Sequence, residues 1–173
     1  GGSRVIRFGT MRSQVVGVEA VLADGSVVGS LDGLPKETAG LHWPSLLAGS
    51  EGTLGIVTQA RLRVMPWYRA TATALVVMTS LSDALELLGR LRRDLSALDS
   101  VEVIQPAAFD LVARHLGVSP PVQLPDRSGA VLVIDVAAHT DPTDDLLGVL
   151  ADAQGIVDTA VAVDPVRREA LLA

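Results

Sequence analysis

The spacing of apolar residues changes at Pro66, and this change constrains the fold more than any other feature of the sequence. Up to Pro66 the apolar residues alternate with polar ones or form short β-branched runs, and both patterns are typical of strands. Beyond residue 69, leucines recur at helical spacing between further apolar runs that indicate strands. We therefore predict an α+β protein with two parts, residues 1–68 and residues 69–173.

Antiparallel strands are predicted in the first part. The β-branched run at residues 15–22 is followed by Asp24-Gly25 and a second apolar pair at residues 27–28. Asp-Gly between apolar runs favours a hairpin because both residues tolerate the positive φ that the turn needs. Residues 43–48 fit a short helical turn. Residues 56–65 alternate between apolar and polar, so we expect a strand with one buried face there.

Helices and strands alternate in the second part. One amphipathic helix is predicted from a leucine stripe with Ser82 as its N-cap, and the stripe consists of Leu81, Leu85, Leu88, Leu91, Leu95 and Leu98. Gly117 is expected to close another helix, at residues 106–116. Strands are expected at 71–79, 101–104, 130–138 and 156–163, and further helices at 142–153 and from 165 onward. Without the helix at 106–116, this order is βαβ followed by βαβ, which is the ferredoxin-like split arrangement.

Charge and composition exclude several functional classes. With 14 Lys and Arg against 20 Asp and Glu, the net charge is −6, and the aromatic residues are 2 Trp, 1 Tyr and 2 Phe. Such a chain has neither the cationic surface nor the stacking platform that nucleic acids require, so we expect no nucleic-acid partner. The absence of cysteine excludes disulfides, iron–sulfur clusters and thiolate zinc sites. No apolar run reaches about 18 residues, so we expect no transmembrane segment. Separately, we expect a cytoplasmic location.

The histidines and carboxylates indicate no metal or acid–base site. His42, His115 and His139 lie far apart in the sequence and in no metal-ligand pattern, so we expect no metal ion and assign them surface or capping roles. His42 is the exception to consider, because it precedes the glycine-rich segment described next. Catalytic residues cannot be assigned from these patterns.

The densest motif is the segment Gly49–Gly55, GSEGTLG, which lies between the expected helical turn and the expected strand. Three glycines spaced three apart leave main-chain amides uncovered by Cβ atoms, so a ligand, especially one that bears phosphate, can approach the backbone closely. The spacing differs from the dinucleotide-binding fingerprint and from a nucleophile elbow. Spacing alone favours a tight loop that needs glycine for its geometry.

Further segments, read with this one, resemble a known family. They are Gly1–Arg4, Arg7–Arg12, Val16–Gly25 and Gly49–Thr58. Together they resemble the FAD-linked oxidases of the vanillyl-alcohol oxidase type, in the branch of D-2-hydroxyacid dehydrogenases that also contains glycolate oxidase. The resemblance is close over residues 1–66 and looser over the remainder.

This resemblance implies a fold, a cofactor and a reaction. Residues 1–68 would be the second part of a PCMH-type FAD-binding domain, and residues 69–173 the first part of a ferredoxin-like cap domain. The intact enzyme would bind FAD, oxidise a D-2-hydroxy acid (lactate, glycolate or 2-hydroxyglutarate) by hydride transfer to flavin, and pass the electrons to a separate acceptor. The residues implied to contact or shape the FAD site are Gly2, Gly49, Ser50, Glu51, Gly52, Gly55, Ile56 and Val57. The last two also fit the core of a strand.

The sequence departs from the family in one motif and in extent. The family usually carries KDNTGYD before the glycine-rich segment, whereas this chain keeps only Lys36 and Gly40 of that motif and has Leu41 and His42 at its last two positions. The family's pyrophosphate-binding subdomain would precede Gly1, and its substrate-binding arginine and His-rich motif would follow the last residue. We therefore expect an internal fragment that is inactive alone and binds FAD weakly.

Two alternatives remain open. Within the flavin superfamily, the intact protein could instead be an alkyl-dihydroxyacetone-phosphate synthase or an alditol oxidase. Outside enzymes, the chain could be a non-catalytic α+β module that binds a small effector or mediates assembly, because the split βαβ fold hosts many functions.

Overall fold

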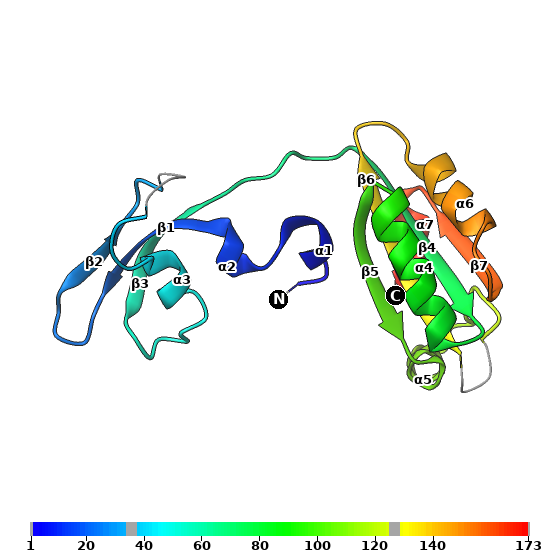
Figure 1. Cartoon of the computed structure of the whole chain (residues 1–173). Helices are drawn as coiled ribbons and strands as arrows, with labels where there is room; N and C mark the ends of the chain where they lie inside the picture. Colours follow the sequence, from blue (N-terminus) through cyan, green and yellow to red (C-terminus); the bar gives the residue numbers. More distant parts are fainter. Residues whose placement is uncertain (1, 34–37, 125–128, 173) are drawn as a thin grey trace. The chain divides into compact units, whose positions relative to one another are not determined.

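The computed structural model describes residues 2–33, 38–124 and 129–172. The chain divides into two compact units, Gly1–Pro66 and Trp67–Ala173. Figure 1 shows both units, and each is described by itself below. The mixture of helices and strands agrees with the predicted α+β class.

The first unit contains a three-stranded antiparallel sheet in the order β2-β1-β3. Its strands are β1 (Val15–Val21), β2 (Val27–Ser30) and β3 (Ile56–Leu62). The predicted hairpin between β1 and β2 is confirmed, with Gly25 at a φ of 84°. The Asp24 carboxylate accepts hydrogen bonds from the Ser26 amide at 3.0 Å and from the Ser26 hydroxyl at 2.6 Å. These bonds hold the turn in place because an aspartate can satisfy the backbone two residues ahead.

Three short helices accompany this sheet: α1 (Val5–Phe8), α2 (Met11–Gln14) and α3 (Trp43–Leu47). A small core forms where Leu47 of α3 packs with Val18 and Ala20 of β1. The expectation that β3 has a buried face is wrong, because all seven of its residues are exposed. The reason is that α3 packs against β1 and β2, which leaves β3 as an edge strand with both faces uncovered.

The second unit alternates strands and helices along the chain. Its elements are β4 (Ala70–Met78), α4 (Leu81–Asp94), β5 (Leu98–Ile104), α5 (Pro106–Leu116), β6 (Ala130–Ala138), α6 (Thr143–Ala151), β7 (Ile156–Ala162) and α7 (Pro165–Leu172). The four strands pair antiparallel in the order β5-β6-β4-β7. Each β-α-β connection, β4-α4-β5 and β6-α6-β7, joins two strands that are separated by one other strand in the sheet. This strand order is typical of the split βαβ arrangement. Helix α5 ends as predicted, at Gly117 in the left-handed conformation.

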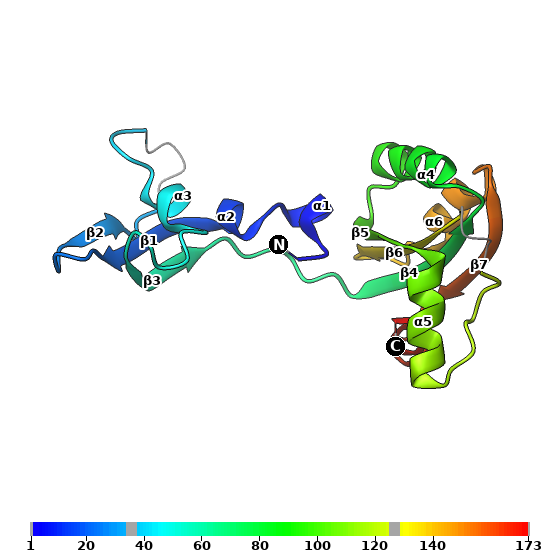
Figure 2. The same ribbon diagram turned by 90° about the horizontal axis from the view of Figure 1, so that it is seen from below.

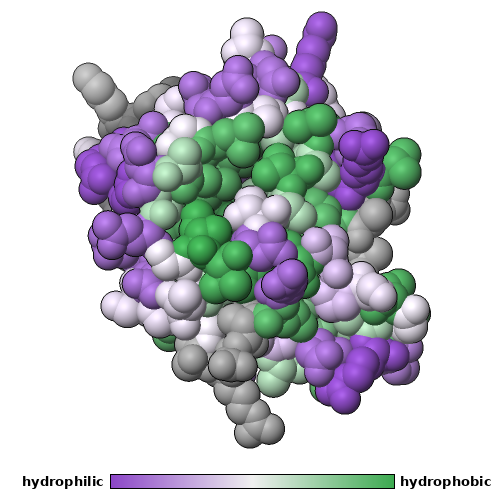
Figure 3. Space-filling model, turned by 90° about the vertical axis from the view of Figure 1, so that its right-hand side faces the viewer, coloured by the Kyte–Doolittle hydropathy of each residue, from purple (hydrophilic) through white to green (hydrophobic). Residues whose placement is uncertain are grey.

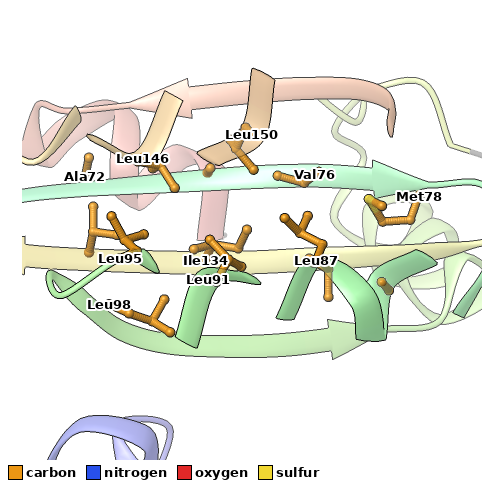
Figure 4. Packing of buried hydrophobic residues seen from close by; sticks show 14 of the residues in the cluster. Ala72, Val76, Met78, Leu87, Leu91, Leu95, Leu98, Ile134, Leu146 and Leu150 are labelled. Carbon is orange, nitrogen blue, oxygen red and sulfur yellow. The ribbon is translucent and has the colours of Figure 1, made fainter. Parts of the chain in front are cut away.

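Helices α4 and α6 cover one face of this sheet, and α5 and α7 lie at the other (Figure 2). Alternate residues of β4 and β6 face α4 and α6. Figure 4 shows this core, with Leu91 of α4 next to Ile134 of β6, and Leu146 and Leu150 of α6 next to β4. Burying such aliphatic side chains contributes about 1.5–3 kcal/mol each. This core therefore dominates the stability of the second unit.

The helix α4 differs from the prediction in its N-cap and in part of its buried face. Its N-cap is Ser80 and not Ser82, since the Ser80 hydroxyl accepts the Asp83 amide at 3.1 Å. The buried seam of the helix is Ala84, Leu87 and Leu91, whereas Leu81 and Leu85 are 52% and 57% exposed. Leu91, Leu95 and Leu98 of the predicted stripe are buried as expected, so the prediction is wrong at the start of the helix, where Ala84 and Leu87 are buried in place of Leu81 and Leu85.

The second unit also has apolar side chains at its surface. Leu147, Val157 and Val163 are exposed. In Figure 3, hydrophobic residues, in green, gather toward the middle of the face shown, with hydrophilic ones, in purple, mainly around them. Single exposed apolar residues are normal for a folded protein.

Candidate functional site

The glycine-rich segment forms a series of tight turns between α3 and β3. Gly49 and Gly52 have φ values of 87° and 79°, and between them Glu51 has a φ of 51°. Within the described part of the chain, Glu51 is the only residue other than glycine with a positive φ. The Ser50 carbonyl accepts the Thr53 amide at 3.0 Å and the Thr53 hydroxyl at 2.6 Å. The loop is thus held by its own hydrogen bonds, although a left-handed conformation costs an ordinary residue about 1–2 kcal/mol.

This loop borders a pocket of about 630 Å³ in the first unit. Three stretches of chain meet at it: the start of α2 with Val15, the end of α3 with the loop, and the start of β3. Its lining residues are Thr10, Met11, Arg12, Val15, Leu47, Ala48, Gly49, Ser50, Glu51, Gly52, Gly55, Ile56 and Val57. The volume lies within the range of about 300–1,000 Å³ that small-molecule and cofactor sites occupy.

The pocket brings together every sequence-predicted site residue except Gly2, which is not among its lining residues. Gly1 and Lys36 lie outside the described residues. Sequence reasoning missed the wall that Thr10, Met11 and Arg12 supply. The family resemblance of their segment, Arg7–Arg12, is the signal in the sequence that points to these residues, and it does not indicate contact with the glycine loop.

The three glycines of the loop serve different purposes. At Gly52 an added Cβ would meet nothing within 4 Å, so the main chain there is open. At Gly49 an added Cβ would lie 3.1 Å from Nη2 of Arg12. At Gly55 it would lie 2.8 Å from the carbonyl oxygen of Val21, so this glycine is needed for the close approach of β1 and β3. Of the three glycines, Gly52 therefore fits best the prediction that a ligand can approach uncovered main chain in this loop.

Ile56 and Val57 lie at the start of β3 and line the pocket. They are 65% and 46% exposed, so the alternative that they are core strand residues is wrong. Because an exposed isoleucine and valine next to open main chain give the pocket an apolar wall, a flat apolar ring system could rest there.

Two charged side chains line the pocket, Arg12 and Glu51. Neither makes a hydrogen bond or an ion pair with another described residue. Both charges are therefore available to a ligand.

His42 has the capping role expected of it and is not among the pocket's lining residues. Its Nδ1 atom accepts the Ser45 amide at 3.3 Å at the start of α3. His139 instead contacts Tyr68, with ring centroids 4.9 Å apart. Within residues 2–33, 38–124 and 129–172, no group of three metal-ligating side chains is found. No helix in these ranges is long and apolar enough to span a membrane.

Sequence comparison gives relatives over about 70% of the chain. The bovine (Bos taurus) mitochondrial D-2-hydroxyglutarate dehydrogenase is 36% identical over 124 residues, which are 71% of this chain and 23% of the relative. The D-lactate dehydrogenase of Archaeoglobus fulgidus is 31% identical over 117 residues, which are 68% of this chain and 26% of the relative. The resemblance to the D-2-hydroxyacid dehydrogenase branch of the FAD-linked oxidases is confirmed. The chain spans about a quarter of the length of these relatives, and no protein-family model matches it.

A solved structure shares the fold. An alkyldihydroxyacetonephosphate synthase superposes with a TM-score of 0.69 over 99% of this chain and 33% of its own, at 18% sequence identity. Identity this low shows a common fold and leaves the reaction open.

Proposed function

We propose that this chain is a segment of an FAD-dependent oxidoreductase that oxidises a D-2-hydroxy acid by hydride transfer to flavin. In this proposal residues 1–68 are the second part of a PCMH-type FAD-binding domain, and residues 69–173 are the first part of a ferredoxin-like cap domain. The observation that carries the proposal is the pocket at the glycine loop, which is lined by open main chain at Gly52 and by the apolar side chains of Ile56 and Val57. The names of the sequence relatives support the substrate class.

The residues at the pocket fit a flavin nucleotide. Gly52 would allow the cofactor to lie against main chain, because no side chain occupies that space. Met11, Val15 and Ile56 would exclude water from the cofactor and bury part of its ring system. Glu51 would accept a hydrogen bond from the cofactor.

When bound, the flavin supplies the hydride acceptor, and the protein supplies binding and orientation. The groups of this chain at the pocket hold and shelter the cofactor. None of the lining residues is assigned a proton-transfer role, so in this proposal the lining residues orient the cofactor and other groups of the intact enzyme bind and deprotonate the substrate. A separate acceptor then takes the electrons.

A second candidate is an alkyldihydroxyacetonephosphate synthase, because the structure of such an enzyme superposes on nearly the whole chain. The dehydrogenases are favoured because their similarity extends to sequence, at 31–36% identity. A substrate panel of D-2-hydroxy acids and acyl-dihydroxyacetone phosphates, tested on the longest natural protein that contains this chain, separates the two. Bleaching of the flavin by a D-2-hydroxy acid is expected.

The cofactor site is tested by titrating that protein with FAD and following flavin fluorescence. Gly52→Val is expected to abolish binding, because the valine side chain would occupy the open space at the loop. Gly25→Val is the matched control: Gly25 also has a positive φ, of 84°, and an added Cβ would meet nothing, yet it lies at a hairpin away from the pocket. Equal loss of FAD affinity in both variants, or none in either, would refute the site.

A further inference from the structure

Arg12 is the only cationic residue among the described residues that line the pocket. It lies in the short helix α2, and its side chain is exposed. The chain as a whole is acidic, with a net charge of −6. Glu51 is the acidic residue that lines the pocket with Arg12, but the guanidinium forms no ion pair with it or with another carboxylate of the described residues, so it is available to an anionic group of a ligand.

The guanidinium lies directly against the glycine loop. An added Cβ on Gly49 would lie 3.1 Å from Nη2 of Arg12, and no other described atom comes within 4 Å of that position. Contacts this short are rare for real Cβ atoms, so a side chain at position 49 would shift the guanidinium by a few tenths of an ångström. Gly49, with its φ of 87°, thus gives the loop a left-handed residue and makes room for Arg12.

We propose that Arg12 binds a phosphate group of the cofactor, in addition to the contacts from the pyrophosphate-binding subdomain that would precede Gly1, and that Gly49 is a positioning residue that keeps the guanidinium against the loop. The proposal rests on the proposed function for the identity of the cofactor. A guanidinium presents a planar set of N–H donors that matches a phosphate and can bind it through two parallel hydrogen bonds. The left-handed turns at Gly49 and Gly52 lie in the same wall, and main-chain amides in such turns bind anions as well.

The test compares ligands that differ in whether they carry phosphate. Affinities for FAD and for riboflavin are measured by fluorescence titration on the longest natural protein that contains this chain. Arg12→Gln is expected to weaken FAD binding by about 10- to 100-fold, because hydrogen bonds to charged groups are the strong ones. Riboflavin affinity is expected to change by less than about twofold, since riboflavin carries no phosphate. Arg63→Gln, which removes a cation that does not line the pocket, is the matched control and should leave both affinities unchanged.

Gly49→Ala tests the positioning role. It is expected to weaken FAD binding in the wild-type background and to have little further effect in the Arg12→Gln background, because both changes remove the same contact. Gly25→Ala controls for the strain of a positive φ. Arg12→Lys keeps the charge and loses the planar donor set, so an intermediate FAD affinity is expected. If Arg12→Gln fails to fold, the proposal is tested with Arg12→Lys instead.

Three outcomes would overturn the proposal. Equal FAD affinities of Arg12→Gln and Arg63→Gln would overturn it and leave the proposed function standing. A rise in the KM for the hydroxy acid with unchanged FAD affinity would also overturn it, because the anion bound would then be the substrate carboxylate. Failure of the wild-type protein to bind FAD would overturn both this proposal and the proposed function.

Discussion

Arg168 of α7 forms hydrogen bonds and an ion pair with the face of the sheet opposite α4 and α6. Its Nε atom donates to the Thr73 hydroxyl at 2.9 Å, Nη1 to the Thr71 hydroxyl at 2.5 Å, and Nη2 to Oδ1 of Asp135 at 3.3 Å. The Ser100 hydroxyl donates to the other oxygen of Asp135 at 3.0 Å. One polar cluster therefore joins α7, β4, β5 and β6.

The burial of this cluster sets the expected effect of Arg168→Met. Exposed ion pairs contribute about 0–1 kcal/mol, whereas removing one partner of a fully buried pair costs about 3–5 kcal/mol. The side chains of Arg168 and Asp135 are 22% and 24% exposed, so this pair lies between the two cases. Asp135 also keeps its hydrogen bonds from Thr73 and Ser100 in the variant. We expect Arg168→Met to lower the free energy of unfolding by about 2 kcal/mol.

Urea unfolding followed by far-ultraviolet circular dichroism measures this free energy. Arg167→Met is the matched control on the same helix, since its side chain is 81% exposed, and a change within about 0.5 kcal/mol is expected. A double-mutant cycle with Asp135→Asn isolates the pair, with an expected coupling of about 1–2 kcal/mol. Equal stabilities of the Arg168 and Arg167 variants, or a coupling near zero, would show that the cluster does not fasten α7.

Two further predictions concern α4. The hydrogen bond from the Ser80 hydroxyl, with a second from Thr79, holds the pKa of Asp83 below its ordinary value of 3.8. Such a carboxylate stabilises the fold above the unfolded-state pKa, and this contribution is lost as the pH falls through the lowered value. Ser80→Ala should therefore raise the pKa of Asp83, and an NMR titration that finds it unmoved would contradict this. Leu91→Ala should cost about 2–5 kcal/mol in urea unfolding, because Leu91 is fully buried. Leu85→Ala, at an exposed position of the same helix, should change the free energy of unfolding by about 0.5 kcal/mol or less; equal losses would disprove the assigned seam.

Much of the candidate site could be predicted from sequence because its loop is one continuous segment. Residues 49–57 carry both the glycines and the start of the strand, so seven of the pocket's lining residues were found together. Arg12 was not found, because it comes from another helix and only folding brings it to the loop. The role of Gly55 was also hidden, since it depends on the backbone of β1.

The features that could be predicted from sequence arise from local interactions. The hairpin at Asp24-Gly25, the end of α5 at Gly117 and the alternation of strands and helices after Pro66 each depend on residues a few positions apart. Their conformations follow from φ preferences and from side chains that bond to the nearest backbone groups.

Which surfaces of the helices and strands are buried depends on tertiary packing. A periodic pattern shows that a helix or strand has an apolar face, but a partner element must be present for that face to be buried. The strand β3 alternates as a half-buried strand should, yet it is exposed because α3 packs on β1 and β2 instead. In α4 the contact with the sheet selected Ala84, Leu87 and Leu91 over Leu81 and Leu85. Burial is a property of two packed surfaces, and one segment of sequence specifies only one of them.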